Sequence, residues 1–192
     1  MQQLSGYFVR FWKHGLRLAY GFDKWHTTSL DQRKYATDII AYGNGRERKD
    51  KAAEIGCGLG DIIRHLQYRI RTGYDQDPKV LKAASFLSRI SGQSIQYKSF
   101  NFPDSVLEGS FDLIIMVNWI HHIDPDLLKF YIEKYFGECL LPGAELLIDT
   151  VQDPEYRVNH NIQFLTKDLN CSIYRLGMYP REREVWAVKK IR

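Results

Sequence analysis

The stretch AAEIGCGLGD, residues 52–61, is an apolar run that ends in three glycines at alternate positions. The apolar part, KAAEIG, predicts a short strand. Glycine lets a backbone bend sharply and approach a neighbour closely, and a glycine loop after the first strand of a doubly wound sheet lies where ligands bind. The dinucleotide fingerprint is GxGxxG, but here the third glycine, Gly60, comes one residue early. The loop therefore indicates a ligand site of another kind.

Beyond this loop, strand patterns alternate with helix patterns along the chain. The run FDLIIMVN has the continuous apolar character of a strand that is buried on both faces. Strands are predicted at 51–56, 71–75, 94–100, 111–118, 144–151, 171–178 and 184–190, and helices at 61–70, 78–90, 124–140 and, as a short segment, within 153–168. This order predicts an α/β fold with a doubly wound, mostly parallel seven-stranded sheet that ends in a C-terminal antiparallel hairpin.

The N-terminal part has a different character. Residues 1–45 show apolar side chains at helical spacing, and a Gly-rich, charged linker follows, so we predict an N-terminal helical section (1–45) and a Rossmann-like domain (46–192). Residues 1–50 hold nine Lys or Arg and five Asp or Glu, which accounts for the whole net charge of +4. This surplus suits an anionic partner, but it falls short of a nucleic-acid-binding signature.

The three cysteines lie far apart and form no CxxC pair, so no disulfide framework is expected. A reducing, cytoplasmic location follows as the default. No apolar run is long enough to cross a membrane.

Several motifs, in order, resemble those of the class I S-adenosylmethionine-dependent methyltransferases. Glu54 stands two residues before the first glycine in EIGCGLG, as in motif I of that family, and GYDQDP places Asp75 at the end of the second strand. FNF at 100–102 corresponds to the loop after strand three, FDLIIMVNWIHHI to the strand-four motif, and LLPGAELLIDT to the turn into strand five. The resemblance covers residues 51–151.

The resemblance implies S-adenosyl-L-methionine as cofactor and assigns residues to it. The glycine-loop backbone would face the methionine part, Glu54 would position its amino group, and Asp75 would accept from the ribose hydroxyls. The implied cofactor-binding residues are Glu54, Gly56, Cys57, Gly58, Gly60, Asp75, Gln76, Asn101, Phe102 and Asn118. Asn101 stands where the family often carries Asp, so the adenine contact departs from the usual pattern.

Two histidines, His121 and His122, follow the fourth strand. Imidazole is the usual general base near neutral pH, so either residue is a candidate to take a proton from a methyl acceptor. The structural alternative is that one packs in the core and the other caps the helix that begins near Asp124. No further ligand cluster accompanies them, and no metal site is predicted.

The N-terminal section offers a lid for the expected site. Tyr20, Trp25 and His26, with Trp119 after the fourth strand, could cover the cofactor, exclude water and select the substrate. One alternative is a pair of helices that only packs on the sheet. Another is peripheral membrane contact through Phe8, Phe11 and Trp12, with Arg10 and Arg17 beside them.

The leading hypothesis is methyl transfer to a small-molecule acceptor, with oxygen favoured over nitrogen. The positive charge suits an anionic acceptor, and the modest size of the chain favours a metabolite or a sugar-type substrate. The pair Asn118-Trp119 is not the Asn-Pro-Pro-aromatic motif of family members that methylate nucleic-acid bases, which argues against a nucleic-acid substrate. The alternatives are a non-catalytic methyltransferase-fold binding protein and an RNA or protein methyltransferase that works with a partner. The sequence leaves the acceptor and the oligomeric state open.

Overall fold

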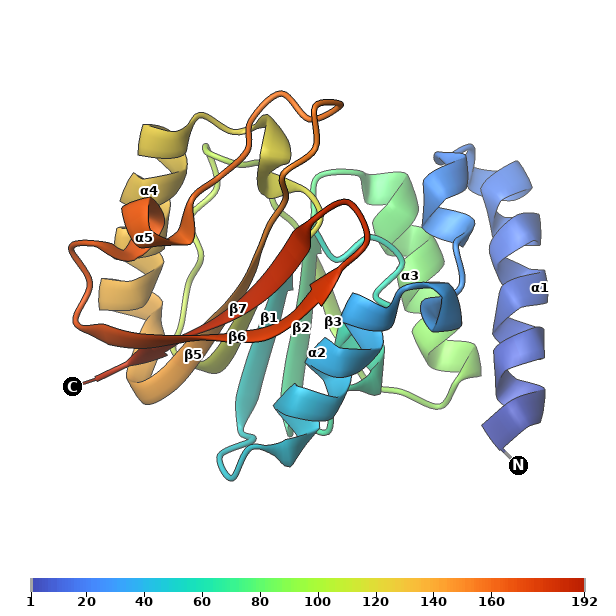
Figure 1. The fold of residues 1–192 in the computed structure, drawn as a ribbon. Helices are drawn as coiled ribbons and strands as arrows, with labels where there is room; N and C mark the ends of the chain where they lie inside the picture. Colours follow the sequence, from blue (N-terminus) through green and yellow to red (C-terminus); the bar gives the residue numbers. More distant parts are fainter. Residues whose placement is uncertain (1, 192) are drawn as a thin grey trace.

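The computed structural model describes residues 2–191, with side chains from residue 11 onward (Figure 1). Its strands are β1 (Lys51–Ile55), β2 (Ile70–Asp75), β3 (Gln96–Ser99), β4 (Phe111–Met116), β5 (Leu140–Thr150), β6 (Cys171–Tyr179) and β7 (Arg183–Lys190). Within the described residues they form one seven-stranded sheet in the order β3-β2-β1-β4-β5-β7-β6. The first five strands are parallel, and β7 pairs antiparallel with both β5 and β6. The predicted fold class is confirmed.

The α-helices are α1 (Gln2–Tyr20), α2 (Lys34–Gly45), α3 (Pro78–Ile90), α4 (Pro125–Lys134) and α5 (Ile162–Thr166). Short helical turns are η1 (Lys24–Thr27), η2 (Leu30–Gln32), η3 (Ile63–His65), η4 (Ile120–His122) and η5 (Tyr135–Cys139). Two helix starts follow directly from the sequence, because Asp-Pro supplies an N-cap carboxylate and a residue suited to the first turn. Asp77 caps α3 by accepting from Lys79 N–H, and Asp124 caps α4.

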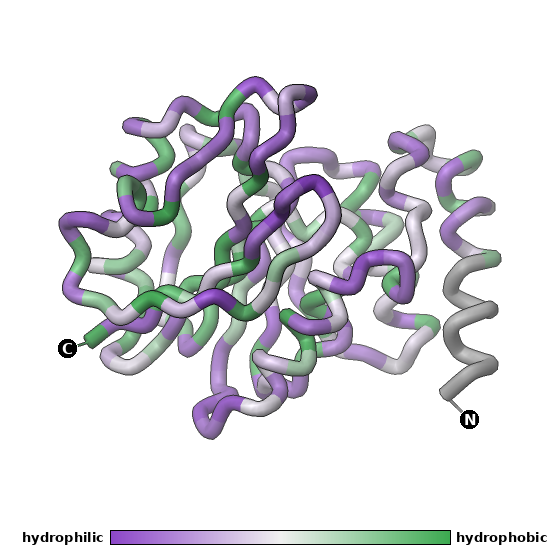
Figure 2. The backbone as a smooth tube through the Cα atoms, viewed as in Figure 1, coloured by the Kyte–Doolittle hydropathy of each residue, from purple (hydrophilic) through white to green (hydrophobic). Residues whose placement is uncertain are grey.

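Alternating residues of the buried strand β4 divide the core between the two faces of the sheet. Leu113 and Ile115 join the apolar cluster beneath α2 and η3, whereas Ile114 and Met116 join the cluster beneath α4 and α5. Figure 1 shows α2 in front of the sheet, and Figure 2 shows the linker from α2 to β1 as a hydrophilic loop. Helix α2, which the predicted boundary at residue 45 assigns to the N-terminal section, therefore contributes directly to the core of the sheet.

Helix α1 lies at the far side of α3 (Figure 1). A third apolar cluster joins Leu16 and Phe22 to Leu87 of α3, and the ring of Trp12 lies 5.1 Å from that of Phe86. Phe11, on another side of the helix, is 76% exposed. The side chains of Phe8 and Arg10, which the sequence assigned to membrane contact, lie outside the described residues. No helix within residues 2–191 is long and apolar enough to span a membrane.

The helix predicted at 61–70 is wrong, because this segment forms turns and only the short η3. Ile62, Ile63 and Leu66 do face the core, as their spacing indicated. However, the Arg71 guanidinium donates to the carbonyls of Arg64 (3.2 Å) and Leu66 (2.9 Å). These are carbonyls that a continuing helix would use for its own hydrogen bonds. The segment thus buries its apolar residues without the helix.

Candidate functional site

The glycine loop crosses the carboxyl end of β1 with its three glycines in the left-handed region. Gly56, Gly58 and Gly60 have φ values of 74°, 53° and 72°. A Cβ on Gly56 would overlap the indole of Trp119, and one on Gly60 would overlap the Tyr97 hydroxyl. Gly56 and Gly60 are therefore required both by backbone conformation and by a close neighbour, and Gly58 is favoured by its backbone conformation.

A cavity of about 670 Å³ opens where β1, β2 and β4 end. Its volume is typical of sites for small organic ligands. The lining comes from three parts of the chain: the N-terminal segment, the loops after β1, β2 and β3, and the segments after β4 and β5. The lining residues are Asp23, Trp25, His26, Ile55, Gly56, Asp75, Gln76, Asp77, Phe100, Phe102, Asn118, Trp119, His122, Ile123 and Tyr156.

Asp75 stands at the end of β2, on the edge of this cavity. Its carboxylate accepts from Gly58 N–H (2.8 Å) and from Asp77 N–H (3.0 Å), so it is oriented by the glycine loop and by the start of α3. A carboxylate has about four lone-pair sites, and two remain for a ligand. With Gln76 beside it in the lining, Asp75 is suited to accept from a pair of hydroxyl groups.

The two residues predicted to flank an adenine ring have different positions. Phe102 lines the cavity and packs edge-to-face against Trp119, with ring centroids 5.5 Å apart. Asn101 is exposed, and its backbone N–H donates to Ser105 Oγ (2.9 Å). Asn101 is absent from the lining of the cavity, so its predicted adenine contact gains no support from its position.

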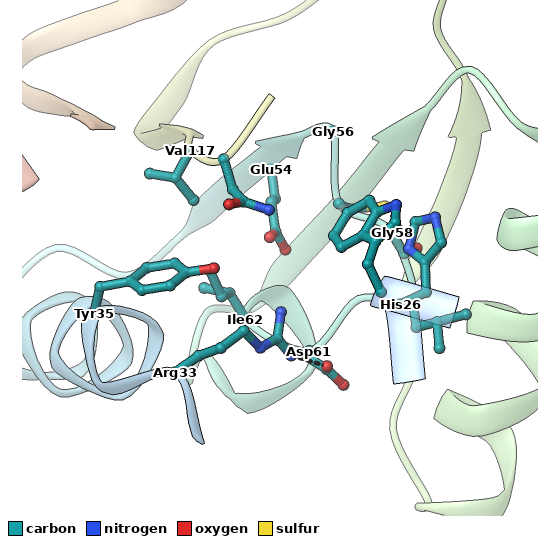
Figure 3. Close-up of a pocket in the computed structure, with 13 residues that line it drawn as sticks. His26, Arg33, Tyr35, Glu54, Gly56, Gly58, Asp61, Ile62 and Val117 are labelled. Atoms are coloured by element: carbon teal, nitrogen blue, oxygen red, sulfur yellow. Dashed lines mark hydrogen bonds and ion pairs between the residues drawn. The ribbon is translucent and has the colours of Figure 1, made fainter. Parts of the chain in front are cut away.

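A second, smaller cavity of about 30 Å³ lies behind the glycine loop (Figure 3). Glu54, Arg33 and Tyr35 point into this space, which is large enough for one small polar group. Glu54 is almost fully buried, and its Oε2 accepts from Ile63 N–H (2.8 Å). Burial raises the pKa of Glu54 to about 8. Glu54, a predicted cofactor-binding residue, lines this cavity, whereas Arg33 and Tyr35 belong to no motif and were not anticipated.

Asp61, the last residue of the loop, is buried among three cations. Lys13 of α1 donates to its Oδ2 (2.6 Å), Arg64 donates to its Oδ1 (2.7 Å), and Arg33 forms a further ion pair with it. Burial alone would raise the pKa of Asp61, but Lys13, Arg64 and Arg33 together hold it well below its usual range. This cluster ties the N-terminal section to the glycine loop.

Asn118 lies at the junction of the two cavities and has a φ of 70°, which asparagine tolerates better than most residues. Its N–H donates to Asp149 Oδ1 (2.9 Å), and its Oδ1 accepts from Arg183 (3.0 Å). Arg183 also pairs with Asp149 and lies over the ring of Tyr35, 4.8 Å from its centroid. Arg183 comes from β7, far away in sequence, and no signal in the sequence pointed to it.

The structure separates the two histidines that follow β4. His121 is fully buried, lies outside the lining of the cavity, and has its Nε2 3.4 Å from Asp149 Oδ2. Burial lowers the pKa of His121 to about 4. His122 is exposed and lines the cavity beside Tyr156. Only His122 can meet a ligand there, and Asp124, rather than a histidine, caps α4.

The lid residues are also divided. Trp25 and His26 line both cavities and stack on each other, with centroids 3.9 Å apart. Trp119 also lines the large cavity. Tyr20 packs instead against the cluster formed by α1 and α3, so it does not take the predicted place over the site. Among the described side chains, no group of three or more His, Cys, Asp or Glu could hold a metal ion.

Comparisons with known proteins agree with this geometry. A family model described as a methyltransferase domain matches residues 53–146. No match was found among curated protein sequences.

Solved structures share the fold. The N-methyltransferase NodS from Bradyrhizobium japonicum WM9, in complex with S-adenosyl-L-homocysteine, is 19% identical with a TM-score of 0.71, covering 92% of this chain and 97% of that chain. Magnesium protoporphyrin IX methyltransferase (ChlM) from Synechocystis PCC 6803, with bound SAM, is 14% identical and superposes with a TM-score of 0.67. The match covers 83% of this chain and 79% of that chain. TehB from Haemophilus influenzae is 13% identical and superposes with a TM-score of 0.66. The match covers 87% of this chain and 64% of that chain. At these identities the likeness concerns the fold.

Proposed function

We propose that this chain, which belongs to the class I S-adenosylmethionine-dependent methyltransferases, transfers a methyl group from S-adenosyl-L-methionine to a small-molecule acceptor. The observation that carries the proposal is the cavity at the carboxyl ends of β1, β2 and β4, with Asp75 oriented on its edge by the glycine loop. In a doubly wound sheet this is the place where nucleotide-like ligands bind.

The residues present fit the cofactor. Asp75 would accept from the ribose hydroxyls, with Gln76 beside it, and Phe102 would pack against the adenine ring. Glu54 would hold the ammonium group of the methionine part in the smaller cavity. The Gly56, Gly58 and Cys57 backbone would run beside that part. When bound, the cofactor supplies an electrophilic methyl group on a positively charged sulfur.

The other residues of the site would position the acceptor and control water. Trp25 and His26 of the N-terminal segment, together with Trp119, would cover the cavity, and excluding water strengthens the electrostatic interactions inside. His122, which lines the cavity beside Tyr156, is the proposed general base. Positioning of the two reactants supplies much of the catalysis in a transfer of this kind.

The partially enclosed cavity favours a metabolite over a macromolecule as acceptor. The modest net charge gives no support to a nucleic-acid partner. All three cysteines are free thiols, and we propose a reducing, cytoplasmic location on that ground.

Isothermal titration calorimetry tests the proposal with S-adenosyl-L-homocysteine and NAD as the two ligands. We expect the first to bind with a Kd of about 50 μM or below and NAD to bind at least about tenfold more weakly. Binding of NAD alone, or of neither ligand, would contradict the cofactor assignment.

A further inference from the structure

We propose that the acceptor is an amine that enters the cavity as a cation, which deepens the proposed function and rests on it. The sequence favoured an oxygen acceptor over nitrogen, and the positive surplus of residues 1–50 suited an anionic one. The side chains that line the cavity favour the opposite charge on the acceptor.

The charged side chains in the lining of the large cavity are acidic apart from the imidazoles of His26 and His122. Asp23, Asp75 and Asp77 contribute three carboxylates, and the lining includes no Lys or Arg. The pKa of His26 is lowered by burial, so this imidazole is neutral near pH 7. An anionic acceptor would meet like charges here, whereas a cation would be attracted.

The positive charges of the N-terminal section are directed elsewhere. Lys13 and Arg33 pair with Asp61 on the buried side of the glycine loop. Arg46 pairs with Glu145 and Arg48 pairs with Asp112, both near the opposite end of the sheet from the cavity. The surplus that suggested an anionic acceptor is therefore largely neutralised by structural partners.

Of the three carboxylates, Asp23 remains for the acceptor. The free sites of Asp75 are assigned to the ribose of the cofactor, and Asp77 caps α3 by accepting from Lys79 N–H. Asp23 precedes η1, is exposed, and makes no capping hydrogen bond to that turn. It stands on the same N-terminal wall as Trp25 and His26.

Aromatic rings complete a surface suited to a cation. Trp25, Trp119, Phe102 and Tyr156 all line the cavity. The faces of such rings attract ammonium groups, with tryptophan the most effective. Rings from the N-terminal segment and from the segments after β3, β4 and β5 thus surround the space that Asp23 borders.

The charge also fits the chemistry of methyl transfer to an amine. The bound ammonium first gives a proton to His122 or to water. The nitrogen lone pair then forms the new N–C bond while the S–C bond breaks and its electron pair stays on sulfur. The positive charge passes from sulfur to nitrogen, so the carboxylate and the rings stabilise a charge that persists throughout the step. With an anionic oxygen acceptor this charge would disappear.

The test compares two matched probes on the protein saturated with S-adenosyl-L-homocysteine at pH 7.5. The cation is 2-phenylethylammonium and the anion is 3-phenylpropionate, and calorimetry measures the Kd of each. We expect the cation to bind about fivefold more tightly, as one exposed carboxylate and the ring faces allow. Asp23→Asn should reduce this ratio to about twofold or less, while Asp104→Asn, which removes an exposed carboxylate outside the lining, should leave it unchanged.

Tighter binding of 3-phenylpropionate, or a ratio that Asp23→Asn leaves unchanged, would overturn the inference. Binding of S-adenosyl-L-homocysteine is measured first in every variant and tests the proposed function separately. Should the nucleoside fail to bind, the two probes still compare the charges that the cavity accepts.

Discussion

Two aspartates at the glycine loop, Asp61 and Asp75, experience opposite surroundings. Asp61 closes the loop on its buried side and contacts three cations from α1, the segment before α2, and η3. Asp75 faces the cavity and contacts only backbone N–H groups. The glycine loop therefore separates a structural charge cluster from a binding surface. The partners of each carboxylate distinguish its role, which is structural for Asp61 and ligand-binding for Asp75.

The difference has a physical cause. A carboxylate that is almost fully buried must recover a large desolvation cost, and three cations at short range do so for Asp61. Asp75 is partly exposed, so it needs no cation and keeps lone pairs free for a ligand. Glu54 lies between these extremes, since it is buried but forms no ion pair with the side chains that the structure describes.

Replacing Asp61 should have the largest effect. Asp61→Asn keeps the shape of the side chain but leaves Lys13, Arg33 and Arg64 without their anion. We expect a loss of about 3–5 kcal/mol in the free energy of unfolding, because uncompensated buried charges are costly. Urea denaturation followed by circular dichroism measures it. Asp104→Asn is the matched control and should change the free energy by less than about 0.5 kcal/mol; a similar small change in Asp61→Asn would contradict the structural role.

The same contrast explains what the sequence predicted. Glu54 and Asp75 stand within a local pattern of strand, loop and strand that resembles the motifs of a known family, so the resemblance could single them out. Two of the three partners of Asp61 lie 48 and 28 residues upstream, at Lys13 and Arg33, and no local pattern indicates such a pairing. The helix expected at 61–70 failed for a related reason, because Arg71 bonds carbonyls that local periodicity assigns to the helix.

The residues of the candidate site also fall into two groups, those that local motifs indicate and those that distant segments contribute. The residues on the loops after β1 and β2 lie where the motifs predicted them. Arg183 reaches Asn118 through the order of the sheet, in which β7 lies beside β5. The burial of His121 and the exposure of His122 depend on how η4 turns, which their adjacent positions could not reveal.

Replacing Asp75 should have the second largest effect and a different signature. Asp75→Ala should weaken binding of S-adenosyl-L-homocysteine by about 1.5–3 kcal/mol, because charged hydrogen bonds to two hydroxyls are lost. Calorimetry gives the affinity, and Asp104→Ala serves as the control. Unchanged affinity would mean that Asp75 does not contact the cofactor. The contrast between a structural Asp61 and a ligand-binding Asp75 would then be wrong.

Glu54 should make cofactor binding depend on pH. In the free protein its pKa is raised to about 8, so the side chain is protonated at pH 7, whereas contact with the ammonium group of the cofactor requires the carboxylate. Binding therefore releases a proton, and affinity for S-adenosyl-L-homocysteine should rise by up to about tenfold per unit between pH 6 and 7.5.

Calorimetry in two buffers with different ionisation enthalpies measures the proton released. In Glu54→Gln the release should vanish and the affinity should become nearly independent of pH in this range. A pH dependence that survives in Glu54→Gln would assign the proton to another group.

Replacing Lys13 should have the smallest effect on the free energy of unfolding, and it tests which members of the charge cluster are essential. The cluster holds three cations around one carboxylate, and burial lowers the pKa of Lys13, so its charge is costly to keep. Lys13→Met retains the packing of the stem and leaves Asp61 paired with Arg33 and Arg64. We expect a loss of less than about 1 kcal/mol by urea denaturation, because Asp61 keeps two cations and the substitution leaves no buried charge uncompensated. A loss as large as that of Asp61→Asn would mean that all three cations are required together, and that the anion alone does not organise the buried side of the loop.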